Sequence, residues 1–108
     1  MRLLLIEDEE VLGRVTAQAL GKASFTVDWV KNGLDAVAAV QGHEYDAILL
    51  DVDNGPDALA HAHNEGLYRG PGLGLAHRAL RPGGVLAVWS FSDDRAFTQR
   101  LARAGFSA

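Results

Sequence analysis

Three acidic side chains, those of Glu7, Asp8 and Asp51, stand at the ends of two short apolar runs, Leu3 to Ile6 and Ala47 to Leu50. In open parallel α/β sheets, ligands bind just outside the carboxyl ends of the strands. If the two runs are neighbouring parallel strands, the three carboxylates converge on one small volume. Like charges that close need a counter-charge or raised pKa values, and carboxylate oxygens are the ligands that hard divalent cations prefer. The spacing therefore predicts a cation site.

The composition limits the classes of protein to which the chain could belong. With 108 residues, 48% of them hydrophobic, we expect one domain with a real apolar core. A net charge of −4 and scattered Lys and Arg argue against binding of DNA or RNA. The absence of cysteine fits a reducing cytoplasm. The first residues contain too short an apolar run for a signal peptide or a membrane span, so we expect a soluble, cytoplasmic protein.

Apolar periodicity in the first half predicts alternating strands and helices. The expected order is a strand at Leu3–Ile6, a helix from about Glu9 to Leu20, a strand at Phe25–Val30, a helix capped by Asn32 that runs to about Gln41, and a strand at Tyr45–Leu50. The apolar residues expected to face inward are Val11, Leu12, Val15, Ala19 and Leu20 in the first helix and Leu34, Val37 and Val40 in the second. Right-handed crossovers then give the strand order 2-1-3.

The second half is rich in glycine and contains all three prolines. We expect short helices near Asp57–Asn64 and from Pro71 to about Leu80, a strand at Val85–Trp89, and an amphipathic helix at Asp93–Ala104 with Phe97, Leu101 and Ala104 facing inward. Trp29 and Trp89 lie on expected strands, where packing is the more common role of an indole. The predicted fold is a three-layer α/β domain with about four parallel strands in the order 2-1-3-4, flanking helices and no fifth strand.

The segments LLLIEDEE, VDWVKNGLDAV and YDAILLD resemble a response-regulator receiver domain, a flavodoxin-like fold, over about residues 1–51. The resemblance implies that Glu7 and Asp8 bind Mg²⁺ and that Asp51 accepts a phosphoryl group from a histidine kinase. It also implies that the backbone carbonyl of Asp53 completes the metal shell. Ser90 stands where receivers keep a hydroxyl that hydrogen-bonds the phosphoryl group. We find no counterpart of the receiver lysine that follows a fifth strand, so metal binding is expected to be better retained than phosphorylation.

Beyond Asp51 the usual receiver pattern is not found, and RPGGVLAVWS suggests a second resemblance. The segment from about 45 to 108 resembles the later half of a class I methyltransferase or spermidine-synthase Rossmann-like fold. That family's glycine-rich turn is missing, because Glu7, Asp8 and Glu9 follow the first strand. Since both families possess a strand like YDAILLD, the sequence suggests a chimera, with a receiver-like half at 1–51 and a methyltransferase-like half at 52–108.

The main functional hypothesis is an engineered or recombined chimeric domain without catalytic turnover, which keeps a vestigial Mg²⁺ pocket at Glu7, Asp8, Asp51 and Asp53. The first alternative is a receiver domain of two-component signalling that is phosphorylated on Asp51 by a histidine kinase. A distant alternative is a fragment of an S-adenosylmethionine-dependent transferase. If Val85–Trp89 is the last strand, its unpaired edge predicts a homodimer or strand exchange through that edge. Neither a nucleic acid nor a membrane is expected as a partner.

Overall fold

The computed structural model describes residues 1–51, 70–89 and 95–107. Strands and helices alternate through these ranges: β1 (Arg2–Ile6), α1 (Glu10–Lys22), β2 (Thr26–Val30), α2 (Gly33–Gly42), β3 (Tyr45–Asp51), α5 (Gly70–Ala79), β4 (Leu80–Trp89) and α6 (Arg95–Arg103). The helix expected near Asp57–Asn64 lies outside the described residues. None of the helices in the described ranges is long and apolar enough to cross a membrane.

The strands form one parallel sheet in the order β2-β1-β3-β4. This order confirms the predicted 2-1-3-4 arrangement. In the centre of the sheet, Leu3 of β1 is paired with Ala47 of β3, and Ile6 is paired with Leu50. The two apolar runs that precede the acidic residues are therefore neighbouring strands that run in the same direction.

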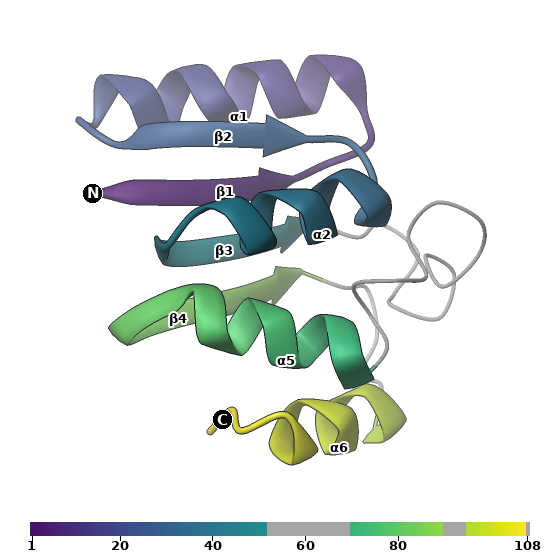
Figure 1. The fold of residues 1–108 in the computed structure, drawn as a ribbon. Coiled ribbons are helices and arrows are strands. Elements are labelled where there is room, and N and C mark those ends of the chain that lie inside the picture. Colours follow the sequence, from purple (N-terminus) through teal and green to yellow (C-terminus); the bar gives the residue numbers. More distant parts are fainter. Residues whose placement is uncertain (52–69, 90–94, 108) are drawn as a thin grey trace.

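The helices are divided unequally between the two faces of the sheet (Figure 1). Helix α1 lies on one face, against β1 and β2, and α2, α5 and α6 lie on the other face. Continuous apolar sequence in β1 is what this arrangement requires, because Leu3, Leu4, Leu5 and Ile6 are buried on both faces of the sheet. All the strands end on the same side of the molecule, so residues that follow β1 and β3 meet at one edge of the sheet.

The main core lies between the sheet and the layer formed by α2, α5 and α6. Strand residues that alternate along the chain point into it, as the two-residue period of a strand demands. Its buried members are Leu4, Ile6, Ala36, Val40, Tyr45, Ile48, Leu50, Leu73, Ala76 and Ala79. Leu101 and Ala104 pack against this core, as predicted for the last helix.

The predicted inward face of α1 is wrong for Val11, Leu12, Val15 and Ala19, whereas Leu20 is half-buried. Val11 and Val15 are each 54% exposed, and Leu12 is 40% exposed. The residue of α1 that is fully buried is Gly13, whose neighbour on the sheet is the ring of Trp29. Even a Cβ at position 13 would overlap that ring, so Gly13 is what lets α1 approach the sheet closely at this point. In α2 the prediction is likewise wrong for Leu34, which is 61% exposed.

Strand β4 is longer than predicted, since it begins at Leu80 rather than at Val85. Its pairing with β3 shifts register between Tyr45 and Ala47, which are paired with Leu80 and Val85 respectively. The Pro82-Gly83-Gly84 segment occupies this irregular stretch, and α5 ends before it, at Ala79. A side chain at Gly84 would place its Cβ 2.8 Å from the carbonyl oxygen of Arg81, so only glycine fits there.

Candidate acidic site at the carboxyl edge of the sheet

The register of β1 and β3 brings two of the predicted site residues together. Because Ile6 is paired with Leu50, the next residues along the two strands are Glu7 and Asp51. Asp8 follows Glu7 and is exposed at the same edge. The geometric premise of the cation site, that the two strands are adjacent and parallel, is thus confirmed. Asp53 and Ser90 lie outside the described residues, as does the side chain of Asp51.

Glu7 is held in place by both its backbone and its side chain. Its backbone N–H donates to the carbonyl oxygen of Val30 at 3.0 Å, which extends the pairing of β1 with β2. Its side chain is buried, with 1% of the residue's surface exposed, and Oε1 accepts a hydrogen bond from the backbone N–H of Glu9 at 2.9 Å. A buried carboxylate at the end of a central strand is costly unless it is matched by polar partners or a cation.

The other acidic residues of this segment support α1. Glu9 is the N-cap of α1, and its carboxylate accepts hydrogen bonds from the backbone N–H groups of Val11 and Leu12. Glu10, in the first turn, pairs with the ammonium group of Lys31, and this hydrogen bond and charge lower the pKa of Glu10. Carboxylates at a helix N-terminus are stabilised by its unpaired N–H groups. Glu9 and Glu10 therefore support the start of α1, which distinguishes them from Glu7 and Asp8.

Trp29 contacts the acidic edge of the sheet, the edge where Glu7 and Asp8 follow β1. From the sequence, only a packing role was expected for this residue. Its indole Nε1–H donates a 3.0 Å hydrogen bond to the carbonyl oxygen of Glu7. The ring lies against Gly13, where an added Cβ would be 2.2 Å from the nearest ring carbon. The side-chain period of β2 places Trp29 on the face toward α1, which was predictable. No signal in the sequence pointed to the hydrogen bond.

The described residues do not by themselves form a complete metal site. Within residues 1–51, 70–89 and 95–107, no group of three or more His, Asp or Glu side chains is placed to hold a metal ion. The predicted set also includes Asp53 and the side chain of Asp51, which lie outside this description. The donor chemistry of Glu7 and Asp8 fits Mg²⁺, because both supply hard carboxylate oxygens.

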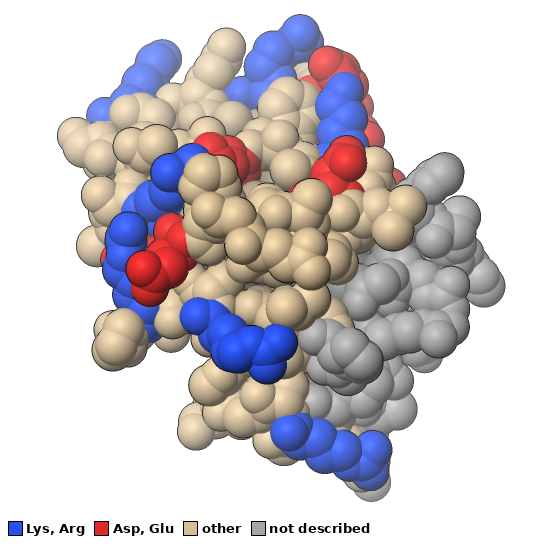
Figure 2. All heavy atoms as spheres, viewed as in Figure 1, with Lys and Arg blue, Asp and Glu red and all other residues tan. Residues whose placement is uncertain are grey.

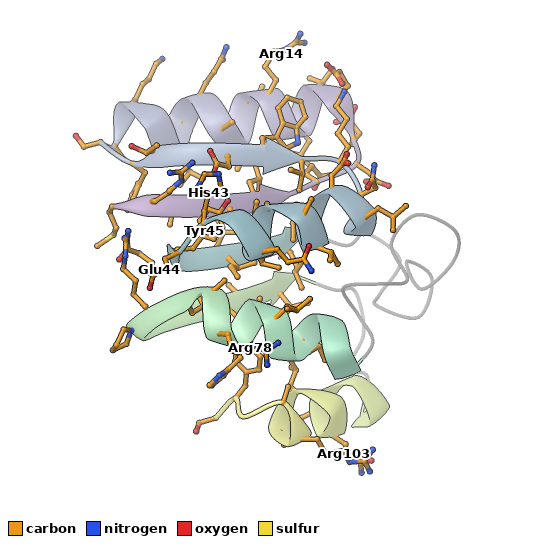
Figure 3. The ribbon with its side chains drawn as sticks, viewed as in Figure 1. Arg14, His43, Glu44, Tyr45, Arg78 and Arg103 are labelled. Atoms are coloured by element: carbon orange, nitrogen blue, oxygen red, sulfur yellow. The ribbon has the colours of Figure 1, made fainter. Side chains whose placement is uncertain are left out.

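A second polar cluster occupies the opposite, amino-terminal edge of the sheet. The hydroxyl group of Tyr45 donates to Asp28 at 2.7 Å, and Nε of Arg2 donates to the same carboxylate at 3.0 Å. Asp46 accepts from the backbone N–H of Arg2 at 2.7 Å and from Arg81 at 2.6 Å. Figure 3 shows His43 and Tyr45 close together at this end of the molecule. This cluster links all the strands of the sheet, so its role is structural.

The charges in this second cluster shift the pKa values of its members. Burial alone would raise the pKa of Asp28, but the hydrogen bonds from Tyr45 and Arg2 and the charge of Arg2 outweigh it, so the pKa is lowered. The pKa of Asp46 is lowered chiefly by the backbone hydrogen bond from Arg2. Burial and the neighbouring Asp28 raise the pKa of Tyr45. The carboxylates are thus held ionised and the phenol neutral.

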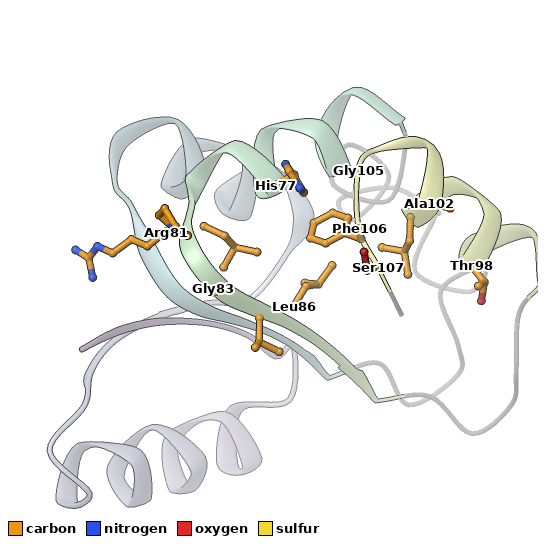
Figure 4. Close-up of a pocket in the computed structure, with 14 residues that line it drawn as sticks. His77, Arg81, Gly83, Leu86, Thr98, Ala102, Gly105, Phe106 and Ser107 are labelled. Carbon is orange, nitrogen blue, oxygen red and sulfur yellow. The ribbon is translucent and has the colours of Figure 1, made fainter.

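A cavity of about 670 Å³ lies between α5, β4 and α6; Arg81 of the second cluster is among its lining residues, and Glu7 and Asp8 are not (Figure 4). Leu86, Leu101 and Phe106 form much of its apolar lining, and His77 packs edge-on against Phe106 with ring centroids 4.9 Å apart. On the face shown in Figure 2, basic and acidic side chains are interspersed rather than gathered by sign.

Curated relatives share sequence with about half of the chain. Over 52 residues, 48% of this chain, it is 48% identical to the transcriptional regulatory protein TcrA of Mycobacterium tuberculosis. Over the same length it is 40% identical to the transcriptional activator protein IrlR of Burkholderia pseudomallei. The matched segment spans only 21% of TcrA and 23% of IrlR. No protein-family model matches the chain.

Solved structures match nearly the whole chain. A response regulator protein from Burkholderia pseudomallei, solved with a phosphorylated aspartic acid, a calcium ion and citrate, aligns over 96% of this chain and 55% of its own, with a TM-score of 0.66 and 19% identity. The chain has the fold of a response-regulator receiver domain. A response regulator from Thermotoga maritima, with a TM-score of 0.59 and 19% identity, aligns over 96% of this chain and 77% of its own.

These comparisons contradict the chimera hypothesis. The receiver structures align through the second half of the chain as well as the first, and neither the relatives nor the solved structures support a methyltransferase segment. The sequence RPGGVLAVWS misled because a buried parallel strand after a turn has the same apolar pattern in any doubly wound sheet. Without the methyltransferase interpretation, the acidic residues that follow β1 and end β3 are the features to consider for function.

Proposed function

We propose that this chain is a receiver module of two-component signalling that accepts a phosphoryl group on Asp51. The observation that carries the proposal is the pairing of Ile6 with Leu50, which puts Glu7 and Asp8 at the same edge of the sheet as Asp51. The similarity to TcrA and IrlR, both transcriptional regulators, supports it. So does the likeness in fold to a response regulator solved with a phosphorylated aspartic acid.

The cation in this proposal is Mg²⁺, held by the carboxylates of Glu7, Asp8 and Asp51 and by the backbone carbonyl of Asp53. A bound divalent cation would offset negative charge on the phosphoryl oxygens and on the carboxylates. The burial of Glu7 and its hydrogen bond from the backbone of Glu9 hold that side chain in position before any ion arrives. A site whose ligands are already placed loses less entropy on binding.

The proposed reaction is a single phosphoryl transfer without turnover. An oxygen of the Asp51 carboxylate forms a bond to phosphorus as the bond between phosphorus and the donor atom breaks. The donor is a phosphohistidine of a histidine kinase, whose imidazole leaves, or a small acyl phosphate in the test tube. Ser90 is proposed to donate a hydrogen bond to a phosphoryl oxygen. The product is an acyl phosphate on the protein, so the domain acts as a switch.

The test uses acetyl phosphate with and without Mg²⁺. We expect intact-mass spectrometry to show one added phosphoryl group in the presence of Mg²⁺. The Asp51→Asn variant should remain unmodified, because an amide oxygen is too weak a nucleophile toward phosphorus. Asp46→Asn is the matched control, since Asp46 lies at the opposite edge of the sheet. Modification that persists in Asp51→Asn would contradict the proposal.

We also propose that two copies of the chain associate through the free edge of β4. In the order β2-β1-β3-β4, β4 is an edge strand within the described part of the chain. Val85 on this strand is 57% exposed. An exposed apolar edge strand presents unpaired backbone groups that can pair with another strand. The proposal keeps the edge predicted from the sequence and predicts a concentration-dependent dimer.

A further inference from the structure

The peptide group between Glu7 and Asp8 is fixed by a side chain from β2. Nε1 of Trp29 donates to the carbonyl oxygen of Glu7 at 3.0 Å. The same peptide group carries the N–H of Asp8, so its orientation determines how both acidic side chains leave the backbone. The N–H of Glu7, on the previous peptide group, is held by Val30 at 3.0 Å. The hydrogen bond from Trp29 therefore supplies the second constraint on this turn of the chain.

Gly13 makes this hydrogen bond possible. A Cβ at position 13 would be 2.2 Å from Cζ2 of Trp29, 2.3 Å from Cε2 and 2.6 Å from Nε1. The edge of the indole that carries the donor thus lies directly on the helix backbone. Any side chain at this position would push that edge away from α1. Because Gly13 is inside the helix, where glycine is normally unfavourable, its presence has a specific packing reason.

A lysine also contacts the indole. The ammonium group of Lys31 lies 5.4 Å from the centre of the ring, within the range of a cation–π contact. Lys31 in turn pairs with Glu10 in the first turn of α1. The indole therefore contacts both the backbone of α1 and a lysine that pairs with α1. These contacts leave the ring little freedom to rotate away from Glu7.

We propose that Trp29 is a positioning residue for the cation site, which orients Glu7 and Asp8 through its hydrogen bond to the Glu7 carbonyl. The inference rests on the proposed function of the acidic edge and names a residue that would not touch the cation. Removal of groups that orient metal ligands commonly lowers metal affinity by about tenfold or more. Trp29→Phe keeps an aromatic ring on Gly13 and removes the donor, so we expect Mg²⁺ to bind about tenfold more weakly.

Val27→Ala is the matched control for the loss of packing. Val27 lies on the same face of β2, two residues before Trp29 and toward the amino-terminal edge. Calorimetric titration with Mg²⁺ compares the two variants with the unsubstituted chain. Equal affinities in Trp29→Phe and the unsubstituted chain would overturn the inference. So would an equal loss of affinity in Val27→Ala, because general loosening of β2 would then explain the result.

A spectroscopic readout tests the same point without comparing affinities. The chain has two tryptophans, so Trp89→Phe leaves Trp29 as the sole indole. We expect Mg²⁺ to shift the indole N–H resonance of Trp29 and to change its fluorescence, and we expect Asp8→Asn in that background to abolish both changes. If calorimetry shows Mg²⁺ binding but the Trp29 signals do not change, the inference about Trp29 is overturned and the proposed function is not. Failure of the unsubstituted chain to bind Mg²⁺ would instead overturn the proposed function.

Discussion

The hydroxyl group of Tyr45 donates a 2.7 Å hydrogen bond to Asp28, and this bond links β3 to β2 across the intervening β1. Tyr45 is fully buried, and the carboxylate it contacts is also paired with Arg2 at 2.9 Å. The Tyr45 side chain thus packs in the core and also forms a hydrogen bond that crosses over β1. At the amino-terminal edge, the charges of the carboxylates are balanced by arginines of the protein itself. At the acidic carboxyl-terminal edge, we propose that a bound cation balances them.

Tyr45→Phe should destabilise the protein with little change in shape. The ring remains, but the carboxylate of Asp28 loses a donor, and a hydrogen bond to a charged group is worth about 1.5–3 kcal/mol. Because the Asp28 side chain is 30% exposed, water compensates in part, and we expect about 1–2 kcal/mol. Urea denaturation measures the loss. A variant as stable as the parent would show that the hydrogen bond contributes nothing.

Stability should fall at acidic pH in a manner that depends on Asp28. Its pKa is lower in the folded protein than in the unfolded chain, so the folded state gains stability above the unfolded value, which is about 3.9. That stability is lost as the pH falls through the lowered folded value. Melting temperatures of Asp28→Asn between neutral and acidic pH should decline less steeply than those of the parent. Parallel curves would contradict the assignment.

Gly13→Ala should be destabilising even though alanine favours helices. The new Cβ would overlap the Trp29 ring, and overpacking of this kind costs about 1–3 kcal/mol. Gly21→Ala is the matched control in the same helix, because no atom lies within 4 Å of a Cβ there. It should stabilise the protein by up to about 1 kcal/mol. Chemical denaturation of both variants provides the comparison, and changes of the same sign would argue against close packing at position 13.

Mg²⁺ should raise the melting temperature, and Glu7→Gln should abolish the rise. An ion that binds only the folded protein stabilises it by about 2.7 kcal/mol at one hundred times its dissociation constant. Without Mg²⁺ we expect Glu7→Gln to be more stable than the parent, since it removes one of several adjacent negative charges. Thermal melts with and without Mg²⁺ check both effects. An unchanged Mg²⁺ response in the variant would exclude Glu7 as a ligand.

Val85→Lys should weaken self-association. A lysine on an exposed edge strand opposes pairing with a second strand, because its charge would have to be buried or held against another copy. Sedimentation velocity over a range of concentrations measures the monomer and dimer populations. Val15→Lys, on the exposed side of α1, is the control and should leave association unchanged. A parent chain that stays monomeric at all concentrations would refute the edge contact.

The strands were predictable because their apolar runs are continuous and a right-handed crossover allows few topologies. The buried face of α1 was not predictable, because periodicity favoured Val11, Leu12 and Val15. The structure uses Gly13 instead, since the ring of Trp29 takes up the space beneath the helix. That choice depends on a residue from another element. Likewise, the start of β4 at Leu80 depends on its irregular pairing with β3 rather than on its own sequence.

For the candidate site, the residue types and their places after β1 and β3 were determined by the sequence alone. An acid that follows an apolar run stands at the end of a strand whatever the strand's neighbours are. The tertiary structure decided that β1 and β3 are adjacent and in register, so that Glu7 and Asp51 share an edge. It also decided that the indole of Trp29 reaches the Glu7 carbonyl. Both are contacts between segments distant in sequence, and such contacts are set by packing of the whole sheet and its helices rather than by local periodicity.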